Sequence, residues 1–323
     1  MYVLGIEVEI AGRRFARVNS VEINESIKSL GKRAVLKLPT TARLERQGEF
    51  VSETETAKEF KTGDPVVIRL GYDGDHAEEF RGFVRKISPG TPLEVECEDL
   101  AYTLRRKNLQ RAFRNVTLEE LLNFILADTG ISLANKVPVI KFRTFSFRTV
   151  NAAQALDKFQ KDYGLTIYFR AYDQLVVGLA SETDGVIVKY VTGRNVIDHD
   201  LEWEDEDDVK LQVKAINVSK DNVFTDVTVG DEDGAKRTIY FYDLAAGENL
   251  GERARQEILK YKYSGYRGSL KAFLLPVCRI GNTVRFTDEN FDNREGDYLV
   301  EETKTTFTTS GGRRIIKIGL KLD

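Results

Sequence analysis

Two histidines and two cysteines are the side chains best suited to act as metal ligands, bases or nucleophiles. His76 lies in a turn rich in glycine and aspartate, and His199 lies in an acidic segment. Neither has a second histidine or cysteine at the spacing of a metal site. Cys97 and Cys278 are far apart and lack a C-x-x-C partner or a nearby histidine. We therefore expect solvated histidines, buried unreactive thiols and no bound metal.

The sequence lacks the motifs that bind phosphate or activate a nucleophile. It contains no G-x-x-x-x-G-K-S/T phosphate loop, no G-x-S-x-G and no H-E-x-x-H. Asp231-Glu232-Asp233-Gly234 lacks the spaced ligands and final glutamate of a calcium loop, so it predicts a β-turn. Many carboxylates are present, but no acid and base pair stands out. The sequence thus predicts a protein that is not an enzyme and has no cofactor.

Two charged segments are candidate interaction surfaces. A basic cluster follows Glu98 and contains Arg105, Arg106, Lys107, Arg111 and Arg114. Few aromatic residues accompany it, which favours ion pairing on a helix surface or a subunit contact over nucleic-acid binding. Residues 198–208 form an acidic run that includes Trp203. This run predicts either a solvated linker or a docking surface for a basic partner, such as the basic cluster of a neighbouring copy. In either case Trp203 would be its anchor.

Composition places the chain among ordinary globular proteins. It has 323 residues, of which 41% are hydrophobic and 31% charged, enough for two or three domains. A net charge of -3 gives no basic field for nucleic acid or anionic membrane. The first residues lack the pattern of a signal peptide, and no apolar stretch approaches the roughly 20 residues of a membrane helix. We expect synthesis in the bacterial cytoplasm and no membrane segment.

A strand pattern occurs twice, once near each end. The first copy is the run 63–70, which opens with Gly63-Asp64, followed by a strand at 82–87. The second is the run 281–286, which opens with Gly281-Asn282, followed by a strand at 296–300. In each copy a tight turn opens one strand, and a second strand begins at a glycine. The pattern predicts two related β-domains.

The remaining elements define three regions. Short β-branched runs with turns between them fill residues 1–99, apart from a polar stretch at 40–58 that predicts an excursion loop and a partner contact. Residues 100–197 predict an α+β region, with one helix capped by Thr117 and ending at Gly130, and another capped by Asn151 and ending at Gly164. Residues 198–323 predict a second β-domain with one helix at 250–261. The expected fold class is mainly β with an α+β insertion.

The order of these parts resembles the hub proteins of contractile tails: the phage late control gene D family, the baseplate hubs of myophages and the N-terminal portion of VgrG spike proteins. Three segments carry the resemblance: 60–72 with 80–84, 152–169 with 175–178, and the late strand that runs from Pro276 through Gly281 to Val284. As an ordered set they extend over nearly the whole chain.

The resemblance implies two tail-tube-like antiparallel β-barrel domains in each subunit of a homotrimer. Three such chains would form a pseudo-hexameric ring between a hexameric tail tube protein and a trimeric spike protein, within a virion or injection particle. Further baseplate and tape-measure proteins would be partners, and nucleic acid would meet the protein only by passing through its channel. The sequence ends at Asp323, after the second β-domain, so the spike is expected to be a separate chain. No lysozyme-like segment is present, so the resemblance implies no hydrolase.

Two alternatives stay open at the level of the sequence. A carbohydrate- or ligand-binding β-protein without catalysis would need a concave aromatic patch. A hydrolase would need one of the scattered carboxylates to be essential. The hub interpretation instead needs assembly surfaces, and the 40–58 stretch, the basic cluster and Trp203 are its candidates.

Overall fold

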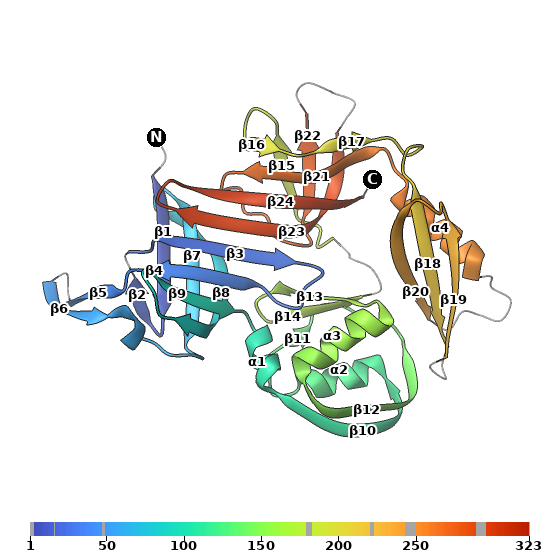
Figure 1. Ribbon diagram of the computed structural model, residues 1–323, viewed down its shortest axis with the longest axis horizontal. Helices are drawn as coiled ribbons and strands as arrows, with labels where there is room; N and C mark the ends of the chain where they lie inside the picture. Colours follow the sequence, from blue (N-terminus) through green and yellow to red (C-terminus); the bar gives the residue numbers. More distant parts are fainter. Residues whose placement is uncertain are drawn as a thin grey trace.

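The computed structural model describes residues 3–15, 17–46, 49–178, 183–219, 223–242, 250–288 and 295–322. The fold is mainly β with an α+β region inserted between two β-rich parts, which confirms the predicted fold class (Figure 1). Within these ranges no helix is both long enough and apolar enough to span a bilayer.

The N-terminal unit consists of strands whose alternate residues enter a common core. Buried side chains such as Val66, Ile68 and Leu70 alternate with more exposed ones, as expected when one face of a sheet is covered. The strands are β1 (Leu4–Ile10), β2 (Arg13–Phe15), β3 (Ser20–Ser26), β4 (Arg33–Leu38), β7 (Pro65–Tyr72), β8 (Asp75–Ser88) and β9 (Leu93–Glu98).

The stretch at 40–58 is a β-hairpin, so the prediction of an excursion loop is wrong. Among the described residues, strands β5 (Thr41–Arg46) and β6 (Glu49–Glu55) pair only with each other, and they project from the unit. A short 3-10 helix, η1 (Thr56–Lys58), follows. An isolated two-stranded sheet need not bury one face, so its sequence carries no alternating hydrophobic signal.

The middle region is a separate core of helices against small sheets. Both predicted helices are present, each opened by a capping box: α2 (Leu118–Leu126) at Thr117 and α3 (Ala152–Tyr163) at Asn151. Gly164 ends α3 in a left-handed conformation as predicted, whereas α2 ends at Leu126, before Gly130. The other elements are α1 (Ala101–Arg106), β10 (Asn108–Thr117), β11 (Ser132–Leu133), β12 (Lys141–Asn151), β13 (Thr166–Ala171) and β14 (Gln174–Gly178).

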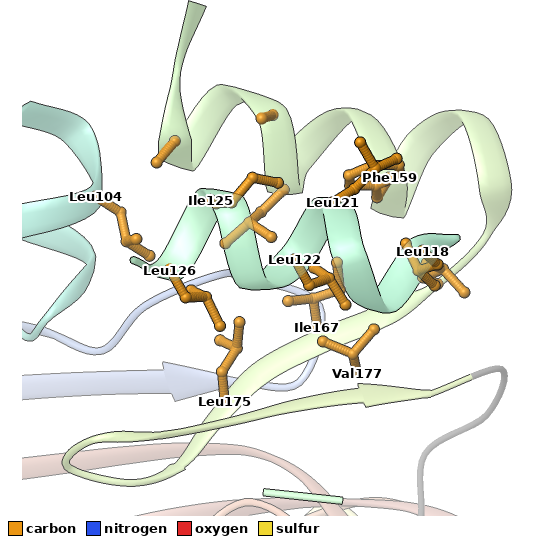
Figure 2. Packing of buried hydrophobic residues seen from close by; sticks show 14 of the residues in the cluster. Leu104, Leu118, Leu121, Leu122, Ile125, Leu126, Phe159, Ile167, Leu175 and Val177 are labelled. Atoms are coloured by element: carbon orange, nitrogen blue, oxygen red, sulfur yellow. The ribbon is translucent and has the colours of Figure 1, made fainter. Parts of the chain in front are cut away.

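Figure 2 shows how this core is filled. One face of α2 carries Leu118, Leu122 and Leu126, which lie between α3 and the β13–β14 hairpin. Phe159 enters from α3 and Val177 from β14, and both are fully buried. Burial of each such side chain contributes roughly 1.5–3 kcal/mol, so the region has its own stabilising core.

The C-terminal unit repeats the β architecture and carries its own insertion. Its strands are β15 (Ile187–Val191), β16 (Val196–His199), β17 (Glu202–Glu204), β21 (Gly265–Ala272), β22 (Thr283–Thr287), β23 (Gly296–Thr308) and β24 (Gly311–Lys321). Between β17 and β21 lies a small sheet of β18 (Leu211–Val218), β19 (Phe224–Gly230) and β20 (Ala235–Tyr242) with α4 (Leu250–Tyr261) beside it.

Both β-rich units belong to one sheet of 14 strands. Its main path runs β16-β21-β24-β23-β3-β4-β9-β8-β7-β1-β2, so β23 and β3 are the point where the units meet. Strands β15 and β16 pair with β22 and β21. We therefore propose that the boundary between the middle and C-terminal regions lies before residue 187, rather than between 197 and 198.

Candidate assembly surface

The two copies of the sequence pattern form the same backbone turn. Gly63 has a φ of 95° and Gly281 a φ of 82°, a left-handed conformation that glycine adopts without steric cost. In each copy the next side chain, Asp64 or Asn282, accepts the backbone N–H of the residue three positions earlier at 2.8 Å. The pattern is therefore a backbone requirement, which explains why it could be detected in the sequence.

The strands after these turns share one hydrogen-bonding arrangement. Gly63 N–H donates to Val84 O at 2.8 Å, and Gly281 N–H donates to Val300 O at 3.1 Å. Val84 N–H returns a bond to Asp64 O, and Val300 N–H returns one to Asn282 O, both at 2.9 Å. Val84 of β8 and Val300 of β23 therefore occupy equivalent positions.

Strand order and register extend this equivalence. The N-terminal unit has the order β7-β8-β9-β4-β3, and the C-terminal unit has the order β22-β23-β24-β21, with β16 and β17 both beside β21. A bulge interrupts both hairpins at the same place, between Val84 and Lys86 and between Val300 and Glu302. The chain contains two copies of one structural unit.

The junction between the copies is an antiparallel pairing of strands. Residues 302–308 of β23 pair with residues 20–26 of β3, so the edge of one unit continues the sheet of the other. The two partners are different parts of the repeated unit, which makes the contact head-to-tail.

Two ion pairs cross this junction. Lys304 Nζ lies 3.0 Å from the carboxylate of Glu22, and Lys28 Nζ lies 2.8 Å from that of Glu301. Both lysine side chains are more than 40% exposed, so each pair contributes at most about 1 kcal/mol. Their main effect is to select the register of the two strands.

A buried ion pair also joins the two units. Arg314 of β24 is 1% exposed and Glu79 of β8 is 2% exposed. The guanidinium donates to both carboxylate oxygens, at 2.7 and 3.2 Å. It also donates to Thr305 Oγ1 at 2.9 Å, Leu274 O at 3.0 Å and Cys278 O at 3.1 Å. In this Arg314–Glu79 clamp the two terminal guanidinium nitrogens make five hydrogen bonds, while the buried Nε has no partner among the described residues.

Only the arginine of the clamp can be recognised from the sequence. Arg314 precedes Ile316 and Ile318 at the period of two that marks the buried face of β24. A cation on that face requires a buried anion. Nothing local identifies Glu79 as the partner, because the two residues are 235 positions apart.

A second buried carboxylate lies where the N-terminal unit meets the middle region. Asp99 accepts the backbone N–H of Lys32 at 2.7 Å and that of Ala101, the first residue of α1, at 2.9 Å. Burial raises the pKa of the Asp99 carboxyl to about 7, because the two hydrogen bonds only partly offset the lost hydration.

The residues of the basic cluster contact their own chain. Arg105 Nε donates to the fully buried carboxylate of Glu98 at 2.8 Å, and Arg106 Nη1 donates to Tyr102 OH at 3.3 Å. Lys107 Nζ donates to Ala127 O and to Phe124 O. Their role in a subunit contact stays a prediction.

The last two members of the basic cluster lie on a strand. Arg111 and Arg114 both belong to β10, and Arg111 lies over the rings of Phe113 at 4.9 Å and Phe124 at 5.3 Å. Arg114 is exposed and stands opposite Thr144 of β12. The five cations thus do not form one helix face.

Trp203 lies within the acidic run, on β17. Its ring meets that of Tyr266 edge-on at 5.1 Å, and its Nε1 donates to Asp205 at 3.0 Å. It packs against the core of the C-terminal unit, while Asp198, Asp200 and Glu202 remain exposed along the same edge. Part of the acidic run is therefore a sheet edge.

His199 is exposed as predicted, whereas Nε2 of His76 is buried without a hydrogen-bond partner among the described residues, so the prediction that both histidines are solvated is wrong for His76. Burial raises the pKa of the Cys97 thiol, and it raises that of Cys278 to about 12, so neither forms a thiolate at neutral pH. No three histidine, cysteine, aspartate or glutamate side chains in the described part of the chain gather as metal ligands would.

A mainly β chain with two joined units of this kind and an α+β insertion has the fold of phage tail proteins. One such structure is the 43 kDa tail protein of prophage MuSo2 from Shewanella oneidensis, which is 15% identical, with a TM-score of 0.63 over 98% of this chain and 96% of that one. A tail protein from Neisseria meningitidis MC58 is 14% identical, with a TM-score of 0.63 over 100% and 97%.

A type VI secretion protein shares the fold as well. The E. coli c3393 protein, described as a component of that system with similarity to the T4 tail proteins gp27 and gp5, is 10% identical. Its TM-score is 0.60 over 98% of this chain and 77% of that one. No protein-family model and no curated protein matches the chain by sequence.

Proposed function

We propose that this protein is a non-enzymatic structural hub of a contractile tail or injection particle. In this proposal it is a homotrimeric adaptor between a hexameric tail tube protein and a trimeric spike protein. The observation that carries the proposal is the pair of equivalent units joined head-to-tail through β23 and β3. Solved phage tail proteins with the same fold support the tail assignment.

The head-to-tail junction provides the physical argument for a ring. When two units are joined through two different edges, each unit keeps one edge free, and the two free edges are of different kinds. Successive copies can add to those edges, and the assembly closes when the rotations sum to a full turn. Three chains would then provide six similar positions on one side and a threefold axis for a spike on the other.

The exposed face of the joined sheet suits a channel wall. Asn24, Lys304 and Lys317 line a depression that crosses the junction. Cross-strand ion pairs balance the charge on this face. Nucleic acid or protein would therefore move along it without binding tightly.

Mass photometry of the purified chain tests the oligomeric state directly. A trimer of the 36.6 kDa chain would appear at about three times that mass, and negative-stain images would show a ring with a central channel. A protein that stays monomeric throughout the micromolar range would overturn the adaptor proposal. Binding of a candidate tail tube protein to the trimer would then test the partner.

A further inference from the structure

The junction inside the chain provides a template for the contact between chains. Within the junction, Ile27 N–H donates to Glu301 O at 3.0 Å, so the next opposed pair, Ser26 and Glu302, is a non-hydrogen-bonded pair. The following such pair is Asn24 with Lys304. If the contact between two chains uses the same two edges of the repeated unit, its strands should pair in the same register.

The edge that corresponds to β23 is the C-terminal half of β8. The turn, the returning hydrogen bond and the shared bulge align Val84 with Val300 and Lys86 with Glu302. Continuing along the strand, Ser88 corresponds to Lys304.

The edge that corresponds to β3 is formed by β16 and β17. In the N-terminal unit Val35 of β4 stands between Glu96 on one side and Glu22 on the other. In the C-terminal unit Ser269 of β21 stands between Lys317 and the backbone of Asp200, whose N–H donates to Ser269 O at 3.0 Å.

The same register along this edge matches two further residues of β3 with residues of β17. Asn24 corresponds to Glu202, which lies opposite Arg267 of β21, and Ser26 corresponds to Glu204, which lies opposite Gly265. These are the two positions that the template places opposite β8.

Both edges are unpaired in the described part of the chain. Strand β7 pairs with β8 only as far as Phe83, so residues 85–88 have β9 as their single neighbour. Apart from one bridge between Val196 and Thr192 at the start of β16, strands β16 and β17 pair only with β21. Edges of this kind normally need cover or a partner.

Given the proposed ring, we infer that residues 85–88 of β8 pair with β16 and β17 of the next copy of this chain. The strands run antiparallel, with Lys86 opposite Glu204 and Ser88 opposite Glu202 of the neighbouring subunit. This contact would close the proposed trimer and would give the acidic run a basic partner on β8.

Charge on the two edges supports a second copy as the occupant. Arg85 and Lys86 are exposed on β8, and their ion-pair partner in the described structure is Glu96, at 3.7 and 3.2 Å. The other edge presents acidic side chains that continue past β17: Asp198, Asp200, Glu202, Glu204, Asp205, Glu206, Asp207 and Asp208. Of these, Glu204 also pairs with Arg267 of its own chain at 2.5 Å. Antiparallel pairing brings the two opposite charges together.

A cysteine pair tests this register in the full-length protein. In a non-hydrogen-bonded pair the Cα atoms are about 4.5 Å apart, within the range that a disulfide spans. Oxidised Lys86→Cys/Glu204→Cys should therefore migrate as a covalent trimer on a non-reducing gel, and each single variant as a monomer. Cys97 and Cys278 are buried and need no replacement.

The matched control is Ser88→Cys/Glu204→Cys, which is two residues out of register. Its Cα atoms would be roughly 8 Å apart and should give only traces of cross-link. If mass photometry shows a trimer but Lys86→Cys/Glu204→Cys cross-links no more than this control, the inferred pairing is wrong. The proposal of a trimeric adaptor would still stand. A protein that forms no trimer would overturn both. A covalent ladder beyond the trimer would support the edge pairing and refute the closed ring.

Discussion

Replacing Glu79 with glutamine breaks the Arg314–Glu79 clamp by removing one of its two charges. The substitution keeps the shape of the side chain but leaves the Arg314 cation, which is 1% exposed, without a buried counter-charge. Breaking a buried pair in this way typically costs about 3–5 kcal/mol. Since whole domains are stable by only about 5–15 kcal/mol, this loss is a large fraction of the total.

Urea unfolding, followed by fluorescence and circular dichroism, measures the effect. We expect Glu79→Gln and Arg314→Met each to lower the free energy of unfolding by that amount. The double variant Glu79→Leu/Arg314→Met should lose much less, because no uncompensated charge remains in the core. Since the clamp links two units, each single variant should also separate the unfolding transitions of those units.

Lys304→Met is the matched control, because its pair with Glu22 also crosses the junction but lies in solvent. The two side chains are each 43% exposed, so the loss should stay below about 1 kcal/mol. If Glu79→Gln cost no more than this control, the clamp would not hold the units together and the reasoning would fail.

Three further predictions follow from the edges and the buried groups. In the proposed register Arg85 and Glu206 occupy the positions that correspond to Glu301 and Lys28 inside the chain. Arg85→Glu or Glu206→Arg should therefore weaken the proposed trimer, and the two together should restore it, as measured by mass photometry at falling concentration. A double variant that does not restore the trimer would argue against this pair. Native Cys97 and Cys278 should react with an aromatic disulfide reagent only after denaturation, because burial raises both thiol pKa values. Asp99 has a pKa raised from its ordinary 3.8 to about 7. It therefore contributes stability below pH 4 that is lost as the pH rises to 7, and Asp99→Asn should flatten that slope in thermal unfolding; an unchanged slope would contradict it.

What could be predicted from the sequence was the part of the fold that local chemistry determines. The capping boxes at Thr117 and Asn151 and the left-handed Gly164 fix helix ends within a few residues, so α2 and α3 were predicted well. The repeated turn was visible because Gly63 and Gly281 need the same backbone conformation. Each of these signals lies within four residues of the feature it predicts.

What could not be predicted depends on contacts between distant segments. Strands β15 and β16 were grouped with the middle region because they follow it in sequence, whereas their partners β22 and β21 lie more than 70 residues later. The basic cluster appeared uniform, but Arg105 has a buried partner in Glu98 and Arg111 lies over aromatic rings. For that reason charge reversal at Arg105 should destabilise the monomer before it affects assembly.

The two copies of the unit differ in charge where they would meet different neighbours. Inside the chain the base, Lys28, lies beyond β3 and the acid, Glu301, lies on β23. At the equivalent positions of the proposed subunit contact, the acid is Glu206 and the base is Arg85. Exchanging the edges would place Arg85 against Lys28 and Glu301 against Glu206, both with like charges. In the proposed ring this inversion would therefore favour strict alternation of the two junctions.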